Sequence, residues 1–132
     1  MTERAAIPTT GPLSSVRILV VEDDADALEL LSEVLRCAGH EVQVATNADE
    51  ALVQVEQFRP ELAIVDIGLP DLDGYELARR IRARAQCRLF ALSGFTATTA
   101  PSDTAVSSFD AHFIKPVDIS ALLRAFVAAK RV

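Results

Sequence analysis

The sequence has few residues of the kinds that form cross-links or zinc sites. Its two cysteines, Cys37 and Cys87, lie far apart and form no C-x-x-C motif. We therefore expect free thiols in a reducing compartment rather than a disulfide or a metal site. The two histidines, His40 and His112, have no partner at metal-ligand spacing, which leaves a zinc site without support.

Long apolar runs and an excess of basic charge are also missing. No apolar stretch approaches the roughly 18 residues of a membrane span, and the N-terminal residues lead into no apolar signal-peptide region. Thirteen Lys and Arg residues stand against 19 Asp and Glu residues, which gives a formal net charge of −6. We therefore expect no membrane segment, no direct binding of nucleic acid and a cytoplasmic location.

The 132 residues are enough for one domain. Half of them are hydrophobic and 24% are charged, a composition that excludes a wholly disordered chain. Residues 1–15 contain Pro8, Pro12 and Gly11 without periodicity, and they are predicted to be a flexible leader or linker. Residues 16–132 are predicted to form the folded domain.

From Val16 onward, short β-branched runs alternate with amphipathic stretches of helical period. Gly39 is placed to cap the first helix at its C-terminus, and Thr46 or Asn47 is placed to cap the second at its N-terminus. The predicted strands are 16–21, 41–45, 62–65, 88–92 and 111–114, and the predicted helices are 25–38, 48–58, about 75–85 and 119–130. This alternation predicts an α/β fold with a doubly wound, five-stranded parallel sheet and helices on both faces.

The segment between the last two strands is different. Residues 95–109 are rich in Ser and Thr and contain Pro101, residue types that disfavour a helix. A short or frayed helix over 102–107 is the most that this composition predicts. Phe109, Phe113 and Phe126 are expected in the core near this segment.

Polar residues follow four of the predicted strands. They are Glu22-Asp23-Asp24, Asp66, Ser93 and Lys115. The ligand sites of open α/β sheets lie beyond the carboxyl ends of their strands, so these side chains are expected at one edge. Clustered carboxylates suit Mg²⁺ or Mn²⁺, and a carboxylate beside such a cation, a Lys and a hydroxyl group could attack a phosphoryl group.

Each of these residues also has a simpler interpretation. A single Asp at a strand end is often a helix cap, the acidic run at 22–24 could complement a helix dipole, and Lys-Pro is often a turn. Their joint occurrence at four strand ends favours a shared site.

The same residues lie in motifs that resemble the receiver domain of bacterial response regulators. The motifs are Ile18-Leu19-Val20-Val21-Glu22-Asp23-Asp24, then Asp66 to Gly74, Ala91-Leu92-Ser93-Gly94 and Phe113-Ile114-Lys115-Pro116. The resemblance covers almost all of 16–132. It implies a flavodoxin-like fold with strand order 2-1-3-4-5, and a domain that catalyses only its own phosphorylation and dephosphorylation.

The resemblance also implies a role for each site residue. Asp66 would be the phosphoacceptor. Asp23 and Asp66 would bind Mg²⁺ or Mn²⁺ directly, Glu22 would act through a water, and Gly68 would supply a backbone carbonyl. Ser93 and Lys115 would bind the phosphoryl group, Gly94 would leave room for the donor, and the bond before Pro116 would be cis. The partners would be a histidine kinase or phosphotransfer domain and an unidentified downstream protein.

Two positions depart from the family pattern. The switch-aromatic position, three residues before the lysine, is His112, and the segment after Phe95 lacks the regular, charged fourth helix. The His-Phe-x-Lys-Pro stretch resembles receivers attached to hybrid sensor kinases. An alternative function is therefore a degenerate receiver that binds proteins without phosphorylation. A phosphatase of the haloacid dehalogenase type is disfavoured, because Gly68 stands where it needs a second Asp.

Overall fold

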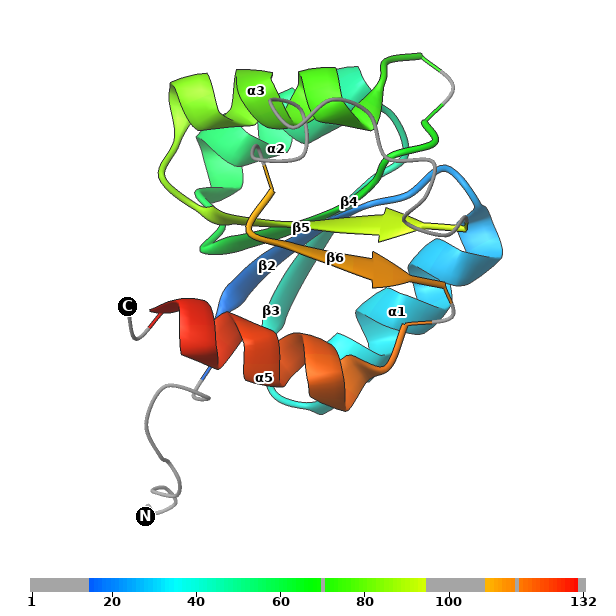
Figure 1. The fold of residues 1–132 in the computed structure, drawn as a ribbon, viewed down its shortest axis with the longest axis vertical. Helices are drawn as coiled ribbons and strands as arrows, with labels where there is room; N and C mark the ends of the chain where they lie inside the picture. Colours follow the sequence, from blue (N-terminus) through cyan, green and yellow to red (C-terminus); the bar gives the residue numbers. More distant parts are fainter. Residues whose placement is uncertain (1–14, 70, 95–108, 116, 131–132) are drawn as a thin grey trace.

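A computed structural model describes residues 15–69, 71–94, 109–115 and 117–130 (Figure 1). Most of the predicted leader, the expected frayed helix over 102–107, and the residues Phe95 and Pro116 lie outside this range. No helix within the described ranges has the length and apolar character needed to cross a lipid bilayer.

The described residues form five strands and four helices that agree with the predicted ones to within about two residues. The strands are β2 (Arg17–Val21), β3 (Glu41–Ala45), β4 (Leu62–Asp66), β5 (Arg88–Ser93) and β6 (Ala111–Ile114), and the helices are α1 (Ala25–Cys37), α2 (Ala48–Phe58), α3 (Gly74–Arg84) and α5 (Ile119–Lys130). Asp66 and Ser93 extend their strands by one residue beyond the prediction. Helix α3 begins at Gly74.

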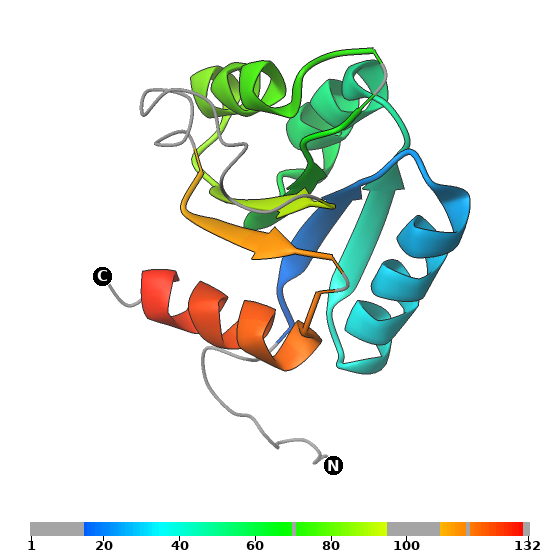
Figure 2. The ribbon, with the colours of Figure 1, turned by 45° about the vertical axis from the view of Figure 1, so that its right-hand side comes forward.

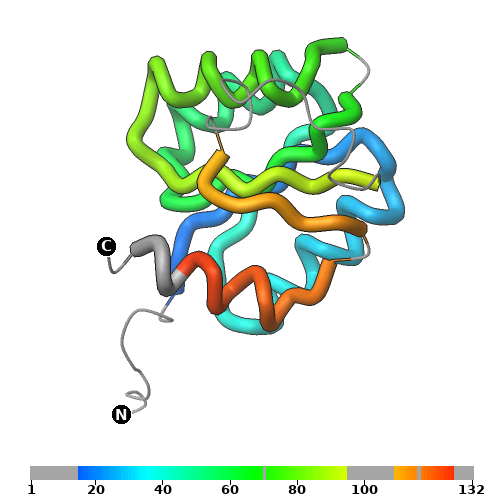
Figure 3. The backbone as a smooth tube through the Cα atoms, in the orientation of Figure 1, coloured from blue at the N-terminus to red at the C-terminus, as the bar shows by residue number. Residues whose placement is uncertain are grey.

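All strand pairs are parallel, and the order in the sheet is β3-β2-β4-β5-β6. This is the predicted order 2-1-3-4-5. Helices α1 and α5 cover one face of the sheet, and α2 and α3 cover the other (Figures 1 and 2). The chain path in Figure 3 passes from the first face to the second after α1 and returns before α5. The predicted doubly wound fold is therefore confirmed.

Alternation along the strands builds a separate core on each face. In β2, Leu19 and Val21 face α2 and α3, whereas Ile18 and Val20 face α1 and α5. Because neither face is open to solvent, the central strands are apolar at nearly every position. Phe109 and Phe126 are buried as predicted, and Phe113 is partly buried against the second core.

Short polar side chains fix where the helices begin. Asp24, Asn47 and Asp73 each accept a backbone N–H from the first turn of α1, α2 or α3. Asn47, rather than Thr46, is thus the cap of α2. Gly39 follows α1 with a φ of +99°, a conformation that favours glycine.

One apolar residue of α1 faces solvent. Leu31 and Leu35 are buried, but Val34, which lies at helical spacing from Leu31, is 37% exposed. Helical spacing alone would place Val34 among the buried residues, whereas burial also depends on a facing element. His40, which has no partner at metal-ligand spacing, is buried, and its Nδ1 accepts the N–H of Val16 at 3.1 Å.

Candidate functional site

Three carboxylates meet where β2 and β4 end. Glu22 and Asp23 follow β2, and Asp66 is the last residue of β4. The two strands are neighbours, with Val21 beside Val65, so their carboxyl ends bring these residues together. The three side chains each offer an oxygen within 4.8 Å of the others, and we call them the acidic cluster. Glu22 and Asp66 are buried, and Asp23 is exposed.

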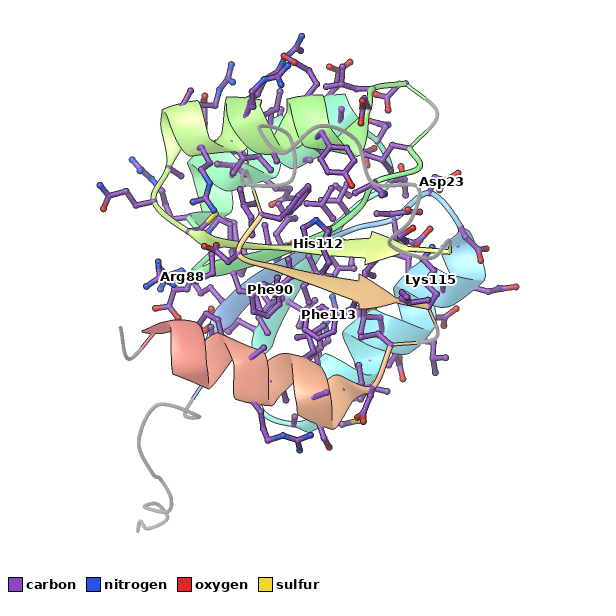
Figure 4. The ribbon with its side chains drawn as sticks, in the orientation of Figure 1. Asp23, Arg88, Phe90, His112, Phe113 and Lys115 are labelled. Carbon is purple, nitrogen blue, oxygen red and sulfur yellow. The ribbon has the colours of Figure 1, made fainter. Side chains whose placement is uncertain are left out.

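A positive charge reaches the acidic cluster from the edge strand. Lys115 follows β6, and its Nζ lies 2.6 Å from Oε1 of Glu22 and 3.2 Å from Oδ2 of Asp66. Its backbone N–H donates to the carbonyl of Ser93 at 2.8 Å, which extends the pairing of β5 and β6. Figure 4 shows Asp23 and Lys115 at the same end of the sheet. The structure thus brings together Glu22, Asp23, Asp66 and Lys115 as the strand ends predict.

The charged groups of this cluster shift one another's pKa values. Burial raises the pKa of Glu22, although Lys115 opposes the shift. Burial would also raise the pKa of Asp66, but the Gly68 N–H and the interactions with Glu22 and Lys115 outweigh it and lower that pKa. Burial opposes the charge on Lys115, yet both carboxylates raise its pKa. Asp66 is therefore held as a carboxylate, the form that acts as a nucleophile.

The two oxygens of Asp66 have different neighbours. Oδ1 accepts the Gly68 N–H at 2.9 Å, and Oδ2 faces the ammonium of Lys115. An added Cβ at Gly68 would lie 3.5 Å from Oδ1, an ordinary contact. Gly68 thus lies beside the carboxylate, where its backbone already contributes one hydrogen bond.

The acidic run at 22–24 divides into different roles. Asp24 caps α1 through its side chain, which is the simpler interpretation of a strand-end acid. Its own N–H donates to Oε2 of Glu22 at 3.1 Å and orients that carboxylate. Glu22 and Asp23 are therefore the two members that belong to the cluster.

The loop between β4 and α3 is anchored at two points. The Gly74 N–H donates to the Ile67 carbonyl at 3.3 Å, and a Cβ at Gly74 would lie only 2.4 Å from Cα of Ile67. The carboxylate of Asp71 accepts the N–H of Ala48 at 3.0 Å, which ties the loop to the start of α2. Sequence reasoning assigned no role to Gly74 or Asp71, although both lie in the motif that follows Asp66.

Two further predicted site residues, Gly94 and His112, lie within the described ranges. Gly94 is exposed, and a Cβ there would meet no atom of the described residues within 4 Å. His112 lies on β6 beside Ala91, with its ring centroid 5.5 Å from that of Phe109 in an edge-to-face contact. Burial lowers the pKa of His112. Pro116 lies outside the described residues.

The donor set of the acidic cluster suits a hard divalent cation. Its three carboxylates are oxygen donors of the kind that Mg²⁺ and Mn²⁺ prefer. The cluster also gathers negative charge that a cation would offset better than Lys115 alone. The residues present therefore fit a magnesium-type ion.

Comparisons with known proteins agree with this geometry. An uncharacterized 14.6 kDa protein of Leptolyngbya boryana is 36% identical over 115 residues, which cover 85% of this chain and 88% of that protein. The DNA-binding response regulator MtrA of Mycobacterium tuberculosis is 35% identical over 100 residues, or 76% of this chain and 44% of MtrA. The chain thus matches less than half the length of MtrA.

A solved structure shows the same fold. The response regulator TrrA from Thermotoga maritima, in complex with Mg²⁺-BeF, superposes with a TM-score of 0.75 at 29% identity, covering 88% of this chain and 97% of that one. Residues 18–127 match the family described as the response regulator receiver domain. The chain therefore belongs to the response regulator receiver domain family of two-component signalling.

Proposed function

We propose that this domain accepts a phosphoryl group on Asp66 from a histidine kinase or a phosphotransfer domain. The observation that carries the proposal is the convergence of Asp66, two further carboxylates and Lys115 at one end of the sheet. The lowered pKa of Asp66 supports it, because only the ionised carboxylate is nucleophilic.

Glu22, Asp23 and Asp66 would hold Mg²⁺ or Mn²⁺, with the backbone carbonyl of Gly68 as a further ligand. The complex of TrrA with Mg²⁺-BeF supports a role for this metal in the family. When bound, the ion would supply positive charge near the oxygens of the transferred phosphoryl group.

The transfer is a displacement at phosphorus. An oxygen of Asp66 forms a bond to the phosphorus of a phosphohistidine as the P–N bond breaks. The bonding pair leaves with the imidazole, which departs neutral because its other ring nitrogen carries a proton. Lys115 would pair with the phosphoryl oxygens in the product, an aspartyl phosphate. Its 3.2 Å distance from Asp66 supports this role.

A change of the partner-binding surface would follow from the charge that phosphorylation adds. Phosphorylation adds roughly −1.5 to −2 charge to an already acidic site. Ser93 would move to hydrogen-bond the new oxygens, next to Gly94 and the Lys115-Pro116 turn. His112 occupies the switch-aromatic position. The surface formed by β6 and α5 would then shift toward its partner-binding state.

The downstream partner would be a protein, in the cytoplasm, and the domain itself would bind no nucleic acid. The chain could act alone or as the receiver of a hybrid sensor kinase. In either arrangement, Asp66 would be the phosphoacceptor.

Intact-mass spectrometry after incubation with Mg²⁺ and acetyl phosphate tests the proposal. The wild type should gain the mass of one phosphoryl group, and Asp66→Asn should gain none. Asp49→Asn, which removes an exposed acid on α2, is the matched control and should be modified like the wild type. An unmodified wild type would favour the degenerate, protein-binding receiver, and a modified Asp66→Asn would exclude Asp66 as the acceptor.

A further inference from the structure

A second polar site lies at the opposite end of the sheet from the acidic cluster. A hollow of about 770 Å³ opens there, and five arginines line it together with Glu61. The arginines are Arg17, Arg59, Arg82, Arg84 and Arg88. Figure 4 shows Arg88 at the far end of the sheet from Asp23 and Lys115. We call this site the arginine hollow.

The backbone of the sheet fixes the centre of the arginine hollow. Arg17 is the first residue of β2 and Arg88 the first residue of β5, on either side of β4. Between them, the Glu61 N–H donates to the Arg17 carbonyl at 2.8 Å, and the Arg88 N–H donates to the Glu61 carbonyl at 3.0 Å. The three residues are therefore held side by side on rigid backbone, which favours a preformed site.

The wall of the arginine hollow comes from two helix ends. Arg82 and Arg84 lie in the last turn of α3, and Arg59 follows the last residue of α2. Arg59 has a φ of 57° and is the one non-glycine residue with positive φ in the described ranges. Glycine is the usual residue in this position, so an arginine here lines the hollow in spite of backbone strain. The Arg59 carbonyl in turn accepts Nε of Arg17 at 2.8 Å.

Positive charge exceeds negative charge at the arginine hollow, in a chain of net charge −6. Among the described residues, five arginines and one carboxylate, Glu61, line the hollow. Two more carboxylates pair at the margin, Asp110 with Arg82 at 3.0 Å and Glu56 with Arg84 at 2.9 Å. Within the described part of the chain, Arg17 and Arg59 make no ion pair with a carboxylate. The excess charge is thus centred on these two residues.

The chemistry of the lining selects the ligand. A guanidinium presents a planar fork of donors that matches the oxygens of a phosphate group. The described lining contains one aromatic ring, Phe126, which is 2% exposed and cannot stack on a base. The volume falls in the range of small-ligand sites. We propose that the arginine hollow binds a small anion with two adjacent phosphate groups, recognised through the diphosphate itself.

Titration of the full chain with inorganic pyrophosphate, followed by amide NMR shifts at constant ionic strength without Mg²⁺, tests the proposal. We expect saturable shifts at residues around 17, 59–61 and 82–88. The double variant Arg17→Gln/Arg59→Gln should weaken binding by about tenfold or more, because it removes charge-assisted hydrogen bonds. The double variant Arg79→Gln/Arg124→Gln removes the same charge from exposed sites outside the hollow and should change affinity less than about twofold.

Titration with ADP tests whether binding depends on the diphosphate alone or also on the nucleoside attached to it. Similar affinities for pyrophosphate and ADP are expected, whereas binding of ADP without pyrophosphate would overturn recognition through the diphosphate. Absence of saturable binding, or equal weakening by both double variants, would overturn the site itself. Phosphorylation of Asp66 is measured separately, so its failure would leave this result unaffected.

Discussion

The ammonium of Lys115 lies 2.6 Å from Oε1 of Glu22, a carboxylate that is 2% exposed. The pair joins the strand at one edge of the sheet to the end of a central strand. It supplies positive charge where three carboxylates gather. The acidic cluster is therefore built with its own counter-charge.

Lys115→Gln removes the counter-charge and leaves two buried carboxylates facing each other. In EDTA, the free energy of unfolding should fall by about 1–2 kcal/mol. Added Mg²⁺ should restore most of this loss, because the cation binds the same carboxylates. Urea unfolding with and without Mg²⁺ measures both effects, with Arg124→Gln on α5 as the control. Equal stability in EDTA would show that the pair contributes little.

Gly74→Ala places a Cβ 2.4 Å from Cα of Ile67, the residue after Asp66. Since backbone must then move, unfolding free energy should fall by about 1–3 kcal/mol, and phosphorylation of Asp66 should slow. Gly94→Ala is the control for stability alone, because its Cβ meets no atom of the described residues within 4 Å. It should change stability by less than about 0.5 kcal/mol. Thermal unfolding compares the two variants, and acetyl phosphate labelling compares Gly74→Ala with the wild type.

His40 predicts a pH dependence of folding. Burial lowers the pKa of His40, so the unfolded chain binds a proton more readily than the folded one. Stability should therefore fall as pH decreases through the usual histidine range near 6.5. His40→Asn keeps an acceptor for the Val16 N–H without titrating, and should reduce this loss by up to about 1 kcal/mol. Urea unfolding of the wild type and His40→Asn between pH 7.5 and 5.5 tests this prediction. An identical dependence of their unfolding free energies on pH would refute it.

Asp71→Ala cuts the tie between the β4–α3 loop and α2. The lost hydrogen bond to the Ala48 N–H acts as a helix cap, so the unfolding free energy should fall by about 0.5–2 kcal/mol. Asp49→Ala removes a nearby acid from the first turn of α2 and controls for the helix dipole. If both variants lose the same amount, charge near the helix end is sufficient to explain the effect of Asp71.

The aspartyl phosphate should persist for minutes rather than seconds. Gly68 and Phe95, which flank the site in the sequence, offer no polar side chain to position an attacking water. Phosphorylated protein freed of donor and followed by intact mass over time measures the lifetime. Loss of the phosphoryl group within seconds would contradict this expectation.

The site could be predicted from sequence where strand ends determine it. Parallel strands share a carboxyl end, so Asp66 and Lys115 could be placed together although 49 positions separate them. The family resemblance already separated Glu22 and Asp23 from Asp24 in the acidic run. The residue types alone could not, because Asp24 caps α1 only once the chain turns after β2.

Features that depend on contacts between distant positions in the chain were the hardest to predict from the sequence. His40 is buried through a bond to Val16, 24 positions earlier, and no local pattern marks such a partner. The arginine hollow draws on positions 17, 59, 82, 84 and 88, which come from separate elements. Val34 has the helical period of a buried residue, but its exposure depends on what packs opposite it.

The arginine hollow and the acidic cluster lie at opposite ends of the sheet. The opposite charges of these two sites contribute a dipole along the strands. A dipolar protein rotates in the field of a charged partner before contact. A partner with a basic surface would thus meet the acidic cluster first, and the association rate would fall with increasing salt as the field is screened.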